Sequence, residues 1–319
     1  MENNYKRLQT EPIVSNEKSI PYWKECGALM TRYFKNGSFL LLDIDGVVCK
    51  ADSLDYPEIT TPRIIAPVKA LETLGVKVGI ATSRGHHIVE HLSFEHGLNL
   101  AGPAILEEGQ VLVLNGEKKY LTSPNHLKFI KSIRRTLMMH PSFQSSWQMV
   151  KTRYETEGLV TFCPGDTQWQ GECRASFWFF SNEKGNEDEL IRSMFQPTLS
   201  KLAVIHELDY KNDLSVSIGR MSVGNLGIMS IKGKKEGQPI NKSAASNFLT
   251  DPWIFVADGF GDTTLAFVTK NFGGCVIGIE GNLDDSDEPK SFLRNADYVL
   301  SNPQEFAKAL EYVASCLNY

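Results

Sequence analysis

The stretch Phe39-Leu-Leu-Leu-Asp-Ile-Asp-Gly-Val-Val48 decides the fold of this chain. Four apolar residues are followed abruptly by two acidic ones, Asp43 and Asp45, and then by Gly46. A short apolar run without alternation is typical of a strand buried on both faces, as in a parallel sheet covered by helices. We therefore expect a buried strand from Ser38 to Asp43 with carboxylates at its carboxyl end.

Six further apolar runs have the same character, and helical periodicity separates most of them. The runs are Val76–Ala81, Ala104–Leu106, Val111–Leu114, Trp253–Ala257, Cys275–Ile279 and Tyr298–Leu300. Helices are expected over 22–34, over 63–74, around Ile88 to Leu92 and from Pro303 onward. Strands that alternate with helices predict an α/β fold, a doubly wound Rossmann-like parallel sheet.

The pattern changes between about residues 121 and 237. Period-two alternation predicts strands at 159–163, 173–180, 202–206 and 214–218, and helices are expected at 126–139 and 187–195. We interpret this region as an α+β module inserted into the α/β core. The predicted divisions are an N-terminal tail and helix (1–37), a first core part (38–118), the inserted module (119–236) and a second core part (237–319).

The composition favours a folded chain with a small-molecule partner. Of 319 residues, 42% are hydrophobic and 22% charged, which excludes a disordered chain, and the net charge of −5 provides no basic field for nucleic acid. The six cysteines form no CxxC pair. No leader-like segment precedes residue 30 and no apolar run could span a membrane, so we expect a cytoplasmic protein.

Acidic residues at strand ends predict a metal site. Asp43 and Asp45 end the first strand, and Asp258 and Asp262 follow the strand Trp253–Ala257. The carboxyl ends of parallel strands form the ligand crevice of such sheets, so these carboxylates should converge. Converging carboxylates repel one another unless a cation neutralises them, and hard oxygen ligands favour Mg²⁺.

Hydroxyl and cationic groups predict that an anion binds beside this metal. Thr82 follows the strand Val76–Ala81, with Ser83 as an alternative donor, and Lys242 opens an expected helix. Three other lysines compete with Lys242 for this role. They are Lys232, Lys234 and Lys235 in a Gly-rich stretch that we interpret as a solvated hinge. A carboxylate nucleophile, Mg²⁺ and a lysine together make a phosphoryl-transfer site.

Four motifs in this order, DIDGVV, ATSR, INKS and DGFGD, resemble those of haloacid dehalogenase superfamily phosphatases. An insertion between the second and third motifs is similar to the C2-capped branch, which contains sugar phosphatases, trehalose- and sucrose-phosphate phosphatases and phosphomannomutases. The resemblance implies that Asp43 is the nucleophile and Asp45 the general acid and base. It further implies that Thr82 and Lys242 hold the phosphoryl group. The implied Mg²⁺ set is Asp43, Asp45 through its backbone carbonyl, Asp258 and Asp262.

The chain departs from this pattern at three places. Val47 stands where many relatives have threonine, and Gly261 stands where sugar phosphatases commonly have asparagine. Glu107-Glu108-Gly109 occupies the position of an Asn-Gly pair in many relatives. Because of these departures, the resemblance does not define the fine geometry of the site or the subfamily.

Some residues have two interpretations each. Arg84 could reach a substrate or pair with an acid. Arg174 and Trp178 share one face of the strand at 173–180, which either covers the site and contacts substrate or faces solvent. His87 and His91 are spaced to bind zinc on a helix, but a structural role is preferred because no Cys or Asp completes the set.

The sequence thus predicts a Mg²⁺-dependent phosphatase that acts on a small phosphate ester, with a sugar or polyol phosphate favoured, through an aspartyl-phosphate. One alternative is a phosphomutase, because Gly158–Asp166 faintly resembles the cap strand by which phosphomannomutases hold a second phosphate, although Thr156 and Thr167 stand where arginines would be expected. Another is a protein that binds a phospho-ligand or partner without turnover. A receiver-like phosphoacceptor domain has no use for so large an insertion.

Overall fold

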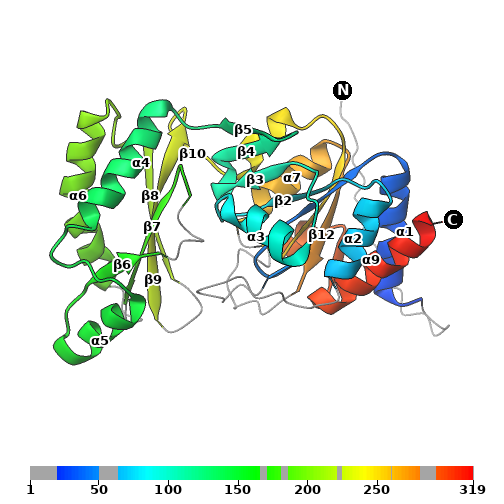
Figure 1. Cartoon of the computed structure of the whole chain (residues 1–319), viewed down its shortest axis with the longest axis horizontal. Coiled ribbons are helices and arrows are strands. Elements are labelled where there is room, and N and C mark those ends of the chain that lie inside the picture. Colours follow the sequence, from blue (N-terminus) through cyan, green and yellow to red (C-terminus); the bar gives the residue numbers. More distant parts are fainter. Residues whose placement is uncertain are drawn as a thin grey trace, which may run out of the picture.

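The computed structural model describes residues 20–49, 64–165, 171–180, 186–220, 225–259, 261–280 and 292–318. These residues form two bodies, each built on one β-sheet (Figure 1). The predicted tail, from residue 1 to 19, lies outside the described residues. No helix among the described residues has the length and apolarity needed to cross a membrane.

The first sheet has eight strands, and β1 lies near its centre. In spatial order they are β13 (Tyr298–Leu300), β12 (Cys275–Ile279), β11 (Trp253–Ala257), β1 (Phe39–Leu42), β2 (Val78–Ala81), β3 (Ala104–Leu106), β4 (Val111–Leu114) and β5 (Glu117–Tyr120). The neighbouring pairs from β13 to β3 are parallel, which confirms the predicted α/β fold. The expectation of a parallel strand at β4 is wrong: the three-residue helix η1 (Glu107–Gly109) is too short for a crossover, so β4 returns antiparallel to β3.

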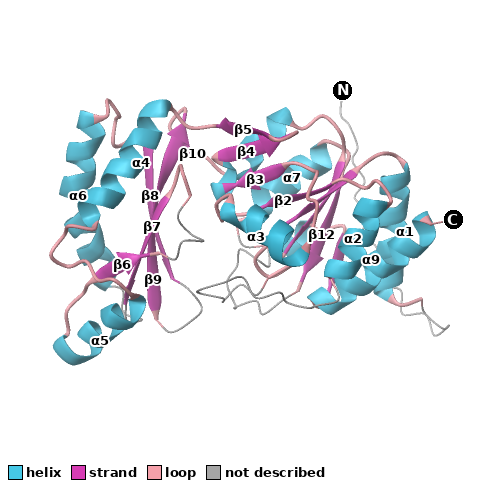
Figure 2. Cartoon of the chain, in the orientation of Figure 1, coloured by secondary structure: helices cyan, strands magenta, loops and turns pink. Residues whose placement is uncertain are grey.

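Helices cover both faces of this sheet (Figure 2). One face packs against α1 (Tyr22–Lys35), α2 (Ile65–Thr73), α3 (His87–His96) and α9 (Pro303–Leu317). The other packs against α7 (Thr263–Asn271) and the 3₁₀ helix η3 (Lys242–Phe248). Within β1, Leu40 and Leu42 join the first core while Phe39 and Leu41 join the second, so the strand is buried on both sides as predicted.

The second sheet belongs to residues 124–239, which we call the inserted module. Its strands are β10 (Gln238–Pro239), β9 (Leu226–Lys235), β7 (Ala175–Phe180) and β6 (Phe162–Pro164), and β8 (Leu214–Arg220) also pairs with β9. Its helices are α4 (Pro124–Leu137), α5 (Trp147–Glu157) and α6 (Asn186–Ile205). In Figure 1, α4 and α6 lie on the side of this sheet that is turned away from the first body.

Two local predictions in the module are wrong. Residues 202–206 are not a strand but the end of α6 and the turn after it, because a short apolar run fits a buried helix end equally well. The stretch 231–235 is not a solvated hinge but part of β9. The predicted division at residue 118 falls inside β5, which pairs with β4 of the first sheet.

Candidate active site

The strand order itself marks where a ligand would bind. From β1 the chain continues through β2 and β3 on one side, and later returns to fill β11, β12 and β13 on the other. The carboxyl ends of β1 and β11 therefore lie at the point where the strand order reverses, which is the usual ligand crevice of open α/β sheets. Leu42 pairs with Val256 in register, so the residues after these two strands lie side by side.

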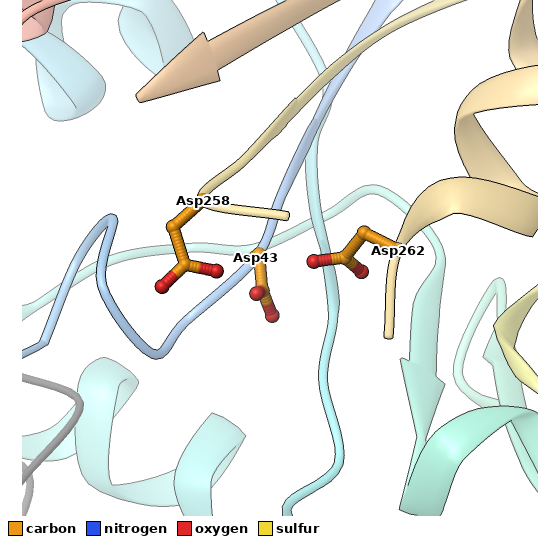
Figure 3. Close-up of side chains that lie close together, drawn as sticks. All are labelled: Asp43, Asp258 and Asp262. Atoms are coloured by element: carbon orange, nitrogen blue, oxygen red, sulfur yellow. The ribbon is translucent and has the colours of Figure 1, made fainter. Parts of the chain in front are cut away.

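Three carboxylates meet at this point (Figure 3). Asp43 follows β1, Asp258 follows β11, and Asp262 directly precedes α7. One carboxylate oxygen of each lies within 4.8 Å of the other two. Asp43 and Asp262 are buried and Asp258 is half-buried. Among the residues that the structure describes, this is the group of His, Cys, Asp and Glu side chains whose spacing suits a metal ion.

Gly46 allows Asp258 to approach. The glycine has a φ of +76°, and a Cβ atom built on it would lie 2.0 Å from Oδ2 of Asp258. Only glycine combines this left-handed backbone with so close a neighbour. The DIDG motif therefore supplies both a carboxylate and the space for a second one.

Lys242 is the cation that the structure itself places among these acids. Its Nζ lies 3.0 Å from Oδ1 of Asp43 and 2.6 Å from Oδ1 of Asp262. Burial alone would lower the pKa of Lys242, but the charges of Asp262 and Asp43 outweigh burial and raise it, so the lysine stays protonated. It begins the 3₁₀ helix η3, where the sequence predicts an ordinary helix.

The electrostatics of the site favour a further cation. Burial, together with the charge of Asp262, raises the pKa of Asp43 well above its ordinary value, and burial raises that of Asp262 as well. Oδ2 of Asp262 is buried and has no hydrogen-bond partner in the described part of the chain. Three carboxylates beside a single lysine leave an excess negative charge, so the donor set fits a hard divalent cation such as Mg²⁺.

Asp45 lies apart from this group because Arg84 holds its carboxylate. Nε of the arginine lies 3.0 Å and 3.1 Å from the two carboxylate oxygens, and an Nη also contacts one of them. Arg84 is fully buried. Of the two roles considered for Arg84, the structure shows the ion pair with an acid.

Thr82 and Ser83 extend from β2 toward the same edge of the sheet. The Thr82 hydroxyl is buried and accepts a hydrogen bond from the Arg84 backbone N–H at 3.2 Å. It keeps its own proton for donation, since a hydroxyl can accept and donate at once. Ser83 is half-buried, and its carbonyl oxygen accepts a hydrogen bond from Nη1 of Arg174 at 3.1 Å.

The inserted module contributes two cations at this edge, and the sequence analysis predicted only one of them. Arg174 and Lys232 both pair with Glu108 of η1. Lys232 was considered only as an alternative to Lys242, in a stretch interpreted as a solvated hinge. The run of apolar residues from Leu226 to Ile231 is the signal that could have revealed this strand, although it does not indicate the partner of Lys232.

Trp178 lies elsewhere than the sequence analysis expected. It packs in a buried cluster with Val150 of α5, Cys163 of β6 and Phe180. All six residues of β7 are buried, so the alternative in which one face of this strand is exposed is wrong. Arg174 contacts Ser83, which follows β2. Trp178 instead packs in the core of the module.

Two other sequence hypotheses gain no support from the geometry. His87 and His91 lie on α3 outside the carboxylate group, and burial lowers the pKa of His87 to about 4, which keeps it neutral. Thr156, one of the positions considered for a mutase, is exposed on α5 and donates to the Thr152 carbonyl. The other, Thr167, lies outside the described residues.

Comparison of the fold with solved structures finds relatives at low identity. The C-terminal domain of the C. albicans trehalose-6-phosphate phosphatase aligns at 13% identity and a TM-score of 0.54, covering 91% of this chain and 96% of that one. A haloacid dehalogenase-like hydrolase from Bacteroides thetaiotaomicron aligns at 15% identity and 0.52, covering 86% and 99%. A trehalose-6-phosphate phosphatase related protein aligns at 15% identity and 0.50, covering 88% and 98%.

The sequence matches no protein-family model and no curated protein. The structural alignments nevertheless extend over nearly the whole length of both chains, so they include the inserted module as well as the first sheet. The chain therefore has the fold of the haloacid dehalogenase-like phosphatases.

Proposed function

We propose that this chain is a Mg²⁺-dependent phosphatase that hydrolyses a small phosphate ester through an aspartyl-phosphate on Asp43. The observation that carries this proposal is the cluster of Asp43, Asp258 and Asp262 at the reversal point of the sheet, with Lys242 paired to the first and last of them. Such a site needs a nucleophile, cations to offset the charge of the phosphate, and donors for its oxygens. The residues named above supply all three.

The proposed reaction has two steps. A carboxylate oxygen of Asp43 attacks phosphorus, the bond to the leaving oxygen breaks, and Asp45 gives its proton to the departing alcohol. Asp45 then takes a proton from water as the water oxygen attacks phosphorus, and the bond to Asp43 breaks to release inorganic phosphate. Arg84 contacts both oxygens of the Asp45 carboxylate, which suits its role as a base in the second step, and this ion pair must open for Asp45 to hold the proton that it gives in the first step.

Three groups would hold the phosphoryl oxygens during these steps. Lys242 lies within hydrogen-bond distance of the nucleophile and brings a permanent positive charge. Thr82 offers a hydroxyl, and Ser83 is the alternative donor. Mg²⁺ held by Asp43, Asp258 and Asp262, with the Asp45 carbonyl, would offset negative charge and polarise the phosphate.

The inserted module would act as a cap that excludes water and selects the substrate. Arg174 and Lys232 of the module already contact the residues beside the proposed phosphate site. Sugar and polyol phosphates are the first substrates to test, since two of the aligned structures are a trehalose-6-phosphate phosphatase and a related protein.

The test is release of inorganic phosphate from sugar phosphates, polyol phosphates, nucleotides and an aryl phosphate. We expect release with Mg²⁺, none after chelation with EDTA, and recovery when Mg²⁺ is returned. Full activity in the chelator would contradict the metal site. If no compound of this panel released phosphate, a phosphomutase or a binding protein would explain the site better than a phosphatase.

A further inference from the structure

A charged triad joins the proposed phosphate site to the inserted module, and its acid is Glu108. The Glu108 backbone N–H donates to the Thr82 carbonyl at 3.1 Å. The next residue, Gly109, packs so closely on Lys242 that a Cβ atom there would lie 2.9 Å from the lysine Cα. Glu108 is therefore held between the two elements that would bind the phosphoryl group.

The Glu108 side chain contacts two cations of the module. One carboxylate oxygen lies 3.1 Å from Nη1 of Arg174, and the other contacts Nζ of Lys232. Arg174 precedes β7 and Lys232 lies on the adjacent strand β9. The side chains of Glu108, Arg174 and Lys232 are 25%, 4% and 13% exposed, so the triad is largely shielded from water but not closed.

Other contacts fix the arginine in place. Its Nη1 donates to the Ser83 carbonyl at 3.1 Å and its Nη2 donates to the Ser230 hydroxyl at 2.8 Å. Because Ser83 directly follows Thr82, this hydrogen bond holds the guanidinium next to the residues that would bind the phosphoryl group. The triad is thus the part of the module that contacts the segments beside the proposed phosphate site.

The charges of the triad select what can occupy that place. Although burial raises the pKa of Glu108, the charges of Arg174 and Lys232 outweigh it and lower the pKa, so the carboxylate is ionised at neutral pH. A second anionic group on a substrate would have to displace the Glu108 carboxylate, whose two oxygens already pair with both cations, and would come into contact with a like charge as it did so. Hydroxyl groups meet no such conflict, since they donate to Glu108 and accept from the cations.

We propose that Glu108, Arg174 and Lys232 form the subsite for the leaving group, and that Glu108 restricts it to hydroxyl-bearing groups without a second negative charge. This inference rests on the proposed phosphatase function and specifies its substrate class. Replacement of Glu108 by glutamine keeps the shape but releases the cations. The variant should then accept leaving groups that carry a carboxylate.

Two matched substrate pairs test this directly. Sorbitol 6-phosphate and 6-phosphogluconate differ only in a terminal CH₂OH or carboxylate, and so do glycerol 3-phosphate and 3-phosphoglycerate. We expect the wild-type kcat/KM to favour the polyol phosphate of each pair by about tenfold or more, and Glu108→Gln to lower that preference by at least about tenfold. Where a compound is not turned over, its competitive inhibition of aryl phosphate hydrolysis gives the same ratio.

Glu172→Gln is the matched control. Glu172 of the module also makes an ion pair with the first body, at 2.5 Å to Nζ of Lys118, but it contacts neither Arg174 nor Lys232 through its carboxylate. Its polyol preference should equal that of the wild type. If Glu108→Gln does not fold, Lys232→Met serves instead and should increase the preference for the polyol phosphate.

The outcomes separate the two levels of the proposal. An unchanged preference in Glu108→Gln, or an equal change in Glu172→Gln, overturns the role of Glu108 while aryl phosphate hydrolysis still supports the phosphatase. No release of phosphate from any ester by the wild type overturns the phosphatase and this inference together.

Discussion

Replacement of Gly46 by alanine should separate metal binding from folding. The new Cβ atom would lie 2.0 Å from Oδ2 of Asp258, 2.6 Å from its Cγ and 2.9 Å from its Cβ. Carbon atoms pack at roughly 3.5 Å from their neighbours, so the carboxylate must move by more than about 1 Å. Protein ligands to Mg²⁺ lie at about 2.0–2.1 Å and tolerate only about 0.2 Å of error, so Asp258 would cease to be a ligand.

The size of the effect follows from two separate terms. The φ of +76° at Gly46 places alanine in the left-handed region, at a cost of roughly 1–2 kcal/mol in stability. Loss of one carboxylate ligand should weaken Mg²⁺ binding by about 10- to 100-fold or more, since even outer partners of ligands have effects of that size. The cost of the left-handed backbone is shared by any glycine of similar φ, whereas the loss of Mg²⁺ affinity is specific to Gly46.

Gly116→Ala is the control for backbone strain. Gly116 has a φ of +78° and no atom within 4 Å of a built Cβ. Both variants are compared by thermal unfolding and by the Mg²⁺ concentration that gives half-maximal phosphate release. We expect a loss of stability in both variants, larger in Gly46→Ala because its Cβ overlaps Asp258, and a raised Mg²⁺ requirement in Gly46→Ala only. An unchanged Mg²⁺ requirement in Gly46→Ala would refute the reasoning.

Two further substitutions address the charges of the site and its surroundings. Lys242→Met leaves Asp43 and Asp262 buried without their cation, so the free energy of unfolding without metal should fall by about 3–5 kcal/mol. Added Mg²⁺ should raise the Tm of this variant more than that of the wild type. A Tm equal to that of the wild type in EDTA would count against this. Because burial lowers the pKa of His87 from 6.5 to about 4, its neutral form stabilises the fold fully above pH 6.5, and this contribution is lost as the pH falls toward 4. The stability of His87→Asn, measured by denaturant unfolding, should therefore fall less steeply than that of the wild type over this range, and identical slopes would contradict the assignment.

The sequence predicted the first sheet well because its strands are short, apolar and buried on both faces. The strands Ala104–Leu106, Trp253–Ala257, Cys275–Ile279 and Tyr298–Leu300 have the predicted bounds. Parallel strands end at the same edge of the sheet, so acidic residues at the strand ends were sufficient to predict that Asp43, Asp258 and Asp262 lie close together. Geometry of this kind follows from strand direction alone.

The inserted module was harder to predict because its pairing is not local. β7 is buried on both faces by α5 on one side and by α4 and α6 on the other, so its alternation did not indicate an exposed face. In the sequence, Lys232 lies in a run of glycines and lysines that is typical of a hinge. Its position beside the site is shown by its ion pair with Glu108, which is 124 residues away in sequence. Such a contact leaves no periodic signal in either segment.

The central claim is that Asp43 is the nucleophile, and the release of inorganic phosphate by Asp43→Asn tests it most directly. The substitution keeps the size of the side chain while removing the attacking oxygen anion, so the fold should survive, as judged by circular dichroism. The account predicts that release from the best substrate of the wild type falls by several orders of magnitude at saturating Mg²⁺. Turnover at the wild-type rate by folded Asp43→Asn would contradict it.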